Sequence, residues 1–173
     1  MNMRTKFLTS FSLLFLIILV AGVISLLQLG KLSRTSARIT TVETPHVEAS
    51  YEILLSTTEA HLWLEEFLSG GEEQDVLARV SSLLEEASRY ATALIEGGEE
   101  ELNRIKPFED PELKSLAALL RDQLAGFSRI TGERYEYFLE TGANSQALDD
   151  QFDRAYEGFV ESGRDLNRLI ADK

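Results

Sequence analysis

The chain has no cysteine, only two histidines and only three prolines among its 173 residues. Without cysteine it cannot form disulfides, thiolate zinc sites or a cysteine nucleophile. Two histidines leave little room for a histidine-rich metal site. Few prolines and eleven glycines, together with abundant leucine, glutamate, alanine and serine, favour a helical protein.

Positive charge is also scarce. Only Arg4 and Lys6 of the 17 basic residues, and none of the 29 acidic ones, precede residue 31. Residues 31–173 therefore carry 15 basic and 29 acidic side chains, a net charge of −14. Binding to phosphate backbones needs a basic face, so this balance argues against nucleic acid as a partner.

Motifs of the common enzyme classes are missing as well. The sequence contains no glycine-rich phosphate loop, no H-E-x-x-H, no EF-hand loop and no G-x-S-x-G. Carboxylates spread along helices are ordinarily solvated. We therefore expect no catalytic activity and assign no catalytic residue.

One long uncharged run stands near the N-terminus, at residues 7–29. Its 23 residues would reach about 35 Å as a helix, enough to cross a hydrocarbon core of about 30 Å. A cleaved signal peptide has a shorter apolar region and ends in small residues, whereas Leu19 stands where a small residue is needed. The sequence predicts a cytoplasmic tail over 1–6 and a retained transmembrane helix over 7–29.

The orientation of this helix is not decided by counting basic residues, which are nearly balanced on its two sides. A six-residue tail stays inside easily, and a domain of charge −14 gains nothing beside anionic cytoplasmic lipid. We therefore expect residues 30–173 to lie outside the cytoplasm. The flanking basic residues are Arg4, Lys6, Lys31, Arg34 and Arg38.

Four helices are predicted in this extracytoplasmic domain, separated by recognisable stops. Paired glycines at 70–71 and 97–98 favour helix ends, and Asp110-Pro111 and Ser145 favour helix starts. Apolar residues recur at spacings of three and four within each segment. The pattern predicts an all-α, antiparallel up-down-up-down four-helix bundle. The predicted helices span about 31–69, 72–96, 111–141 and 146–172.

The chain resembles the four-helix-bundle ligand-binding domains of bacterial chemoreceptors and transmembrane sensor kinases. Residues 3–33, MRTKFLTSFSLLFLIILVAGVISLLQLGKLS, look like the start of such receptors, and HLWLEEFLSG at 61–70 looks like a string of their sensor regions. The resemblance implies a sensor in the bacterial inner membrane with a periplasmic or external domain. It also implies a homodimer formed through the first and fourth helices.

In that family a second membrane helix and a cytoplasmic signalling region follow the bundle. A sensor fragment of a longer receptor and a free-standing anchored bundle therefore both stay open. The second would be a structural or adaptor protein that acts by protein–protein contact.

Polar residues on apolar stripes are the candidates for a binding site. His61, Glu65, Arg134 and Asp153 fall at one height, roughly 12–14 Å from the membrane-distal tip of the predicted bundle. This layer would bind a small polar or anionic ligand between the helices. The alternative is an internal salt-bridge network in which Arg134 pairs with Glu65 or Asp153. The candidate ligand-binding residues are His61, Trp63, Glu65, Arg134, Tyr137 and Asp153, and Arg79 falls at the same height.

A metal site is a sharper version of the same hypothesis. His61 and Glu65, four residues apart, would offer two ligands on one helix face, and Asp149 or Asp153 would add another. No cofactor other than such a divalent ion is expected. His46 is about 22 Å from His61 along the helix axis and is predicted to be a satisfied core histidine.

Overall fold

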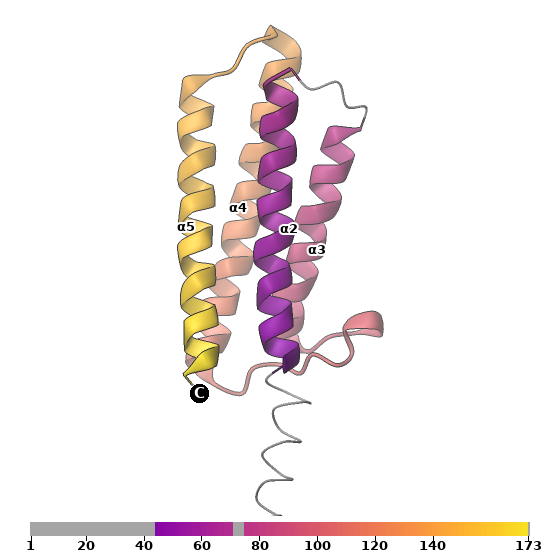
Figure 1. Cartoon of the computed structure of the whole chain (residues 1–173), viewed down its shortest axis with the longest axis vertical. Coiled ribbons are helices and arrows are strands. Elements are labelled where there is room, and N and C mark those ends of the chain that lie inside the picture. The colour runs from indigo at the N-terminus through magenta and orange to yellow at the C-terminus, as the bar shows by residue number, and fades with distance from the viewer. Residues whose placement is uncertain (1–43, 71–74, 173) are drawn as a thin grey trace, which may run out of the picture. The chain divides into compact units, whose positions relative to one another are not determined.

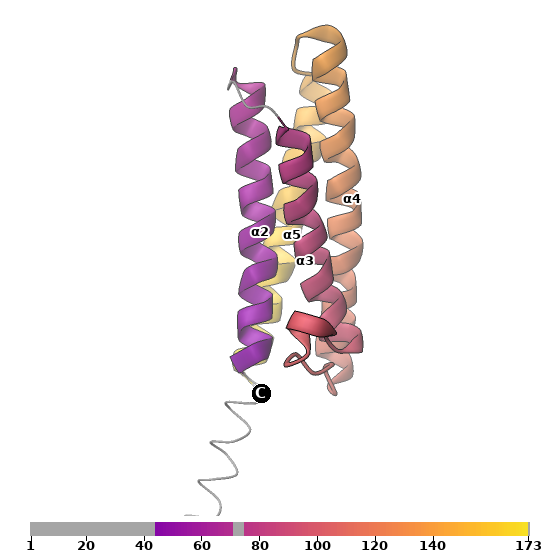
Figure 2. The same ribbon diagram turned by 90° about the vertical axis from the view of Figure 1, so that its right-hand side faces the viewer.

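The computed structural model describes residues 44–70 and 75–172, which form a bundle of helices lying side by side (Figures 1 and 2). Within these residues there is no β-strand, which confirms the all-α prediction. Helix α2 contacts α3 and α5, and helix α4 contacts the same two helices. The elements are α2 (Thr44–Leu68), α3 (Val76–Glu96), the short 3-10 helix η2 (Glu100–Leu102), α4 (Pro111–Thr141) and α5 (Gln146–Ala171).

Local capping explains where α4 and α5 begin and where α4 ends. The Asp110 carboxylate accepts hydrogen bonds from the backbone of Glu112 at 2.9 Å and of Leu113 at 3.4 Å. The Ser145 hydroxyl accepts one from Leu148 N at 3.5 Å. Gly142 closes α4 in the left-handed conformation, with φ of 67°. Asp110 and Ser145 are the helix starts that the sequence predicted, and α4 ends at the predicted residue 141.

The start of α3 differs from the expected residue 72. The helix begins at Val76, and the residue before it, Asp75, has φ of 72° and ψ of 24°. This left-handed conformation cannot be part of a right-handed helix, so Asp75 lies outside α3.

Two predicted features lie outside the described residues. These are the tail and membrane helix at 1–29 and the first part of the first predicted helix, at 31–43. Among the helices of residues 44–70 and 75–172, none has the length and apolar character needed to cross a membrane.

The core contains many of the apolar residues that recur at spacings of three and four, together with others outside that pattern such as Leu64 and Leu84. Phe127, Phe152 and Phe159 are fully buried and fill its centre together with smaller residues of α2 and α3. Burial of these side chains is the main favourable contribution to the stability of the bundle. The fully buried residues of that pattern include Ala49, Ile53, Val80, Ala87 and Leu94.

The segment between α3 and α4 covers one end of the core. Ile105 and Phe108 are buried, and Phe108 N donates to Leu94 O at 2.8 Å. His46 lies against this segment, with Nε2 2.7 Å from Lys106 O and its ring centroid 4.6 Å from that of Phe108. His46 is thus the satisfied, buried histidine that the sequence predicted.

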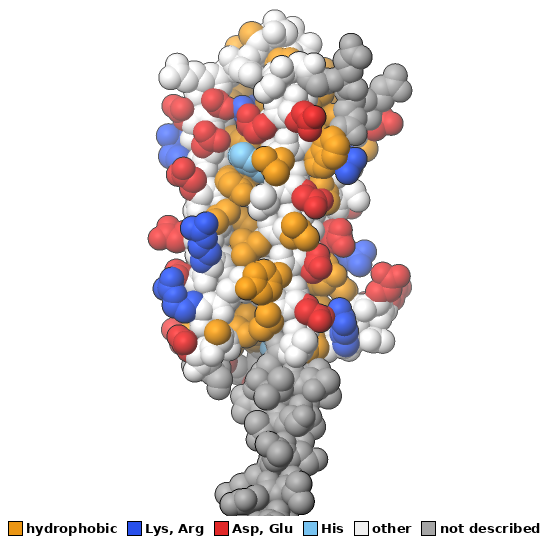
Figure 3. All heavy atoms as spheres, in the orientation of Figure 1, with side chains coloured by type: hydrophobic (Ala, Val, Ile, Leu, Met, Phe, Trp, Pro, Cys, Tyr) orange, Lys and Arg blue, Asp and Glu red, His pale blue; other side chains and the backbone are white. Residues whose placement is uncertain are grey.

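Hydrophobic side chains remain exposed along the face that Figure 3 presents, between rows of charged ones. Tyr51, Leu55 and Leu62 of α2 are all more than half exposed. Acidic and basic side chains border this apolar strip in the same view (Figure 3). The strip is a candidate contact surface and not a part of the core.

Two glycines are expected to respond in opposite ways to alanine. A Cβ at Gly98 would lie 1.9 Å from the carbonyl oxygen of Leu102, whereas a Cβ at Gly132 would meet nothing within 4 Å. Gly98→Ala should therefore destabilise the bundle by about 1–3 kcal/mol. Gly132→Ala, inside α4, should stabilise it by about 0.5–1 kcal/mol. Chemical denaturation midpoints check both, and equal shifts of the same sign would contradict the expectation.

Candidate functional site

A buried arginine joins three helices of the bundle. Arg134 of α4 is only 3% exposed, and its Nη1 donates to Glu65 Oε1 of α2. Its Nη2 donates to Asp149 Oδ1 of α5. The sequence interpretation of an internal salt-bridge network therefore has the right arginine and Glu65, but the second partner is Asp149 and not Asp153.

An aromatic ring packs against this ion-pair network. The guanidinium carbon of Arg134 lies 4.7 Å from the ring centroid of Phe152. Phe152 stacks in turn on Phe127, with ring centroids 4.8 Å apart. A cation over an aromatic face is attracted by the negative charge density of that face, so Phe152 adds to the stabilisation of the buried charge.

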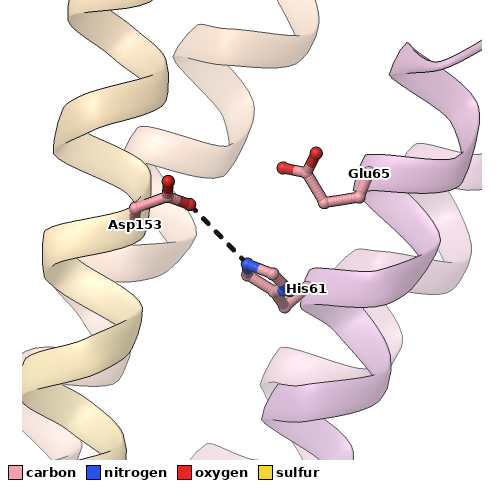
Figure 4. A group of neighbouring side chains, drawn as sticks. All are labelled: His61, Glu65 and Asp153. Carbon is pink, nitrogen blue, oxygen red and sulfur yellow. Dashed lines mark ion pairs between the residues drawn. The ribbon is translucent and has the colours of Figure 1, made fainter.

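His61 lies beside the same ring. Its imidazole stacks on Phe152 at 5.0 Å and on Tyr156 at 4.1 Å between ring centroids. The Tyr156 hydroxyl donates to Thr58 Oγ1 at 3.1 Å, which fixes this ring to α2. His61 Nε2 lies 3.9 Å from Asp153 Oδ1 (Figure 4). Stacking therefore holds the imidazole with Nε2 directed toward α5.

The surroundings of His61 favour its uncharged form. Burial lowers the pKa of His61 below its usual value, and the neighbouring Arg134 acts in the same direction. The carboxylates of Glu65 and Asp153 oppose this shift, but burial has the larger effect. An uncharged imidazole keeps a nitrogen lone pair for a hydrogen-bond donor or a metal ion.

Three potential ligand groups converge beside Arg134. One ligand atom each from His61, Glu65 and Asp153 lie within 4.8 Å of one another. Figure 4 shows Glu65 and His61 projecting from one helix toward Asp153 on another. The structure thus brings together four of the predicted site residues: His61, Glu65, Arg134 and Asp153.

The other predicted site residues lie elsewhere. Trp63 is two residues beyond His61, which turns it about 200° around the helix axis. Its ring packs under Arg79 of α3, with the guanidinium carbon 3.7 Å from the ring centroid. Tyr137 is 39% exposed on α4. Trp63 and Arg79 therefore contact each other, and Tyr137 is exposed and not buried with Arg134.

Sequence reasoning missed Asp149 as a partner of Arg134 and Tyr156 as a neighbour of His61. A signal for both exists in α5, where Asp149, Phe152, Asp153 and Tyr156 follow one another at spacings of three, one and three. Counted from Asp149 they stand at i, i+3, i+4 and i+7, and residues at these positions share one side of a helix.

The assembled cluster consists of Arg134, His61, Glu65, Asp149 and Asp153, and we call it the polar cluster. With uncharged His61 it holds three carboxylates and one guanidinium, a net charge of −2. Because Arg134 is already paired with two of these carboxylates, the cluster suits a polar or cationic ligand better than an anion. No protein-family model, curated protein or solved structure matches the chain.

Proposed function

We propose that the chain is the sensor region of a bacterial transmembrane signalling receptor. In this proposal residues 7–29 anchor it in the inner membrane, and the bundle lies in the periplasm or outside the cell. The helices follow one another in antiparallel, up-down-up-down order, an arrangement that the short connections 69–75 and 142–145 favour. The protein has no catalysis of its own.

The observation that carries the proposal is the polar cluster around Arg134, the one buried Lys, Arg, Asp or Glu side chain in the described part of the chain. Buried charges are costly, and hydrophobic replacements of buried ion pairs are often at least as stable. A stability requirement alone therefore does not explain the buried Arg134. Binding of a small polar ligand between the helices would explain this residue, because such a ligand needs a few polar groups within an apolar site.

The position of the cluster relates binding to movement. His61 and Glu65 belong to α2, the first helix of the described residues after the predicted membrane segment, and Asp149 and Asp153 belong to α5. A ligand that draws these side chains together would favour one relative position of α2 and α5. A ligand shifts such an equilibrium by its difference in affinity for the two positions.

A second candidate function follows from the exposed apolar strip of Tyr51, Leu55 and Leu62. A membrane-anchored adaptor would use this strip for protein–protein contact. In a receptor the same strip would lie in the homodimer, which involves α2 and α5. The two candidates differ in whether the polar cluster binds a small molecule.

The test is a ligand screen on the full chain in lipid nanodiscs. Trp63 is the only tryptophan and lies near the cluster in height, so its fluorescence reports unfolding of the bundle. Amino acids, small organic acids and cations would be added singly. A ligand at a hundred times its Kd stabilises by about 2.7 kcal/mol, a rise in Tm of roughly 5–10 °C.

A matched pair of variants locates the site. We expect His61→Ala to abolish the rise in Tm, and Asp165→Asn to keep it, because Asp165 pairs with Arg168 elsewhere on α5. A screen without any ligand would favour the adaptor. A ligand that both variants still bind would place the site outside the polar cluster.

A further inference from the structure

We propose that His61, Glu65 and Asp153 bind one divalent transition-metal ion, Zn²⁺ being the best match, between α2 and α5. This inference rests on the proposed sensor function and names the class of ligand that the polar cluster receives. It starts from the geometry of the three side chains in Figure 4.

The donor atoms are near the spacing that a tetrahedral ion requires. With bonds of about 2.0–2.2 Å to nitrogen and oxygen, neighbouring ligand atoms around Zn²⁺ lie about 3.4 Å apart. His61 Nε2 and Asp153 Oδ1 are 3.9 Å apart, which is longer than an ordinary hydrogen bond. All three donor atoms lie within 4.8 Å of one another. Small side-chain rotations therefore complete the site.

The chemistry of the donors selects the class of ion. One imidazole and two carboxylates suit Zn²⁺ and its neighbours in the first transition row. Ca²⁺ needs six to eight oxygen ligands, and Mg²⁺ is usually held by carboxylates and water in octahedral geometry. Three protein ligands leave a fourth position of the ion for water or for a second ligand.

Charge balance supports a divalent ion. The polar cluster has a net charge of −2 when His61 is uncharged, and one divalent cation neutralises it. Asp149 and Arg134 contribute to this balance without binding the ion, because Asp149 is not one of the three convergent donors and a guanidinium has no lone pair to offer.

Arg134 acts as a positioning residue for the site. Its Nη1 holds Glu65 Oε1, so the ion would take the other carboxylate oxygen. Metal-binding side chains are commonly oriented in this way by hydrogen bonds from a second set of residues. His61 is oriented in a similar way, because its imidazole stacks on both Phe152 and Tyr156.

The consequence for signalling is a metal-dependent link between two helices. Two ligands come from α2, four residues apart, and one comes from α5. Binding would draw the side chains of α2 and α5 together and fix the relative position of the two helices. The metal would thus act on the helix pair that the proposed sensor uses.

The experiment uses the untagged full chain in nanodiscs, stripped of metal with a chelator that is then removed. Zn²⁺ binding is measured by calorimetry and Co²⁺ binding by its visible absorption, which is strong for tetrahedral ions. We expect one ion per chain. His61→Ala and Asp153→Asn should each weaken binding by about 100-fold or more. The rise in Tm caused by Zn²⁺ should disappear with them.

Two control variants test whether the effect is specific. His46→Gln removes the only other histidine, and Glu66→Gln removes the exposed acid next to Glu65. Both should bind Zn²⁺ as the wild type does. Circular dichroism of the metal-free variants checks that each is folded. Zn²⁺ binding that survives in both His61→Ala and Asp153→Asn, or that is absent from the wild type, would overturn the metal site.

The two proposals fail in different ways. If no metal binds but another compound from the screen does, and His61→Ala abolishes it, the metal site is wrong and the sensor function stands. If neither metal nor any other compound binds the cluster, both are wrong.

Discussion

The double substitution Glu65→Gln, Asp149→Asn is expected to destabilise the bundle by about 3–5 kcal/mol, as for other buried ion pairs that lose one partner. It leaves the Arg134 guanidinium, which is 3% exposed, without either of its ion-pair partners. The Nε of Arg134 is already a buried donor without a hydrogen-bond acceptor, so the two carboxylates carry the compensation. Chemical denaturation followed by far-ultraviolet circular dichroism measures the loss.

Replacing Arg134 itself tests whether the lost stability comes from an uncompensated buried charge. Arg134→Met alone should cost less than the double substitution, because the side chains of Glu65 and Asp149 are 36% and 43% exposed and can be hydrated. Adding Arg134→Met to the double variant should restore most of its stability, because a buried apolar side chain then replaces an uncompensated charge. A double variant within 1 kcal/mol of the wild type would contradict this account.

Helix boundaries were predictable where one residue determines them locally. Asp110, Gly142 and Ser145 each act on the backbone within a few residues, so their effect is visible in the sequence. The start of α3 was not, because the left-handed conformation of Asp75 has no glycine to indicate it. Burial of Ile105 and Phe108 was not predicted either, since it depends on contacts with distant helices.

The candidate site was predictable in height but not in direction. A rise of about 1.5 Å per residue is common to all α-helices, so counting from the turns placed His61, Arg134 and Asp153 in one layer. The direction of each side chain depends on how each helix is rotated within the bundle. For this reason the height alone could not separate the cluster from Trp63, which packs against Arg79, or from Tyr137, which is exposed.

The choice between Asp149 and Asp153 shows the same limit. The two residues are one turn apart on α5, and either one could have faced Arg134. The structure pairs Asp149 with Arg134 and leaves Asp153 near His61. A difference of one helical turn, set by how α4 and α5 pack, thus separates the ion-pair network from the proposed metal ligands.

Substitution of two core phenylalanines should separate stability from binding. Phe152 and Phe159 are both fully buried on α5, two turns apart, so Phe152→Ala and Phe159→Ala should each cost about 3–5 kcal/mol. Only Phe152 has ring contacts with His61 and lies under the guanidinium of Arg134. Phe152→Ala should therefore also weaken Zn²⁺ binding, by about 10-fold or more, as losses of supporting residues do at other metal sites.

Phe159→Ala is the matched control, because it creates a similar cavity without removing a ring from the polar cluster. Its Zn²⁺ affinity should equal that of the wild type at a temperature where both variants are folded. Calorimetry of the two variants, with denaturation curves measured on the same preparations, makes the comparison. Equal losses of affinity would mean that binding follows overall stability, and the support of His61 by Phe152 would then have no part in forming the site.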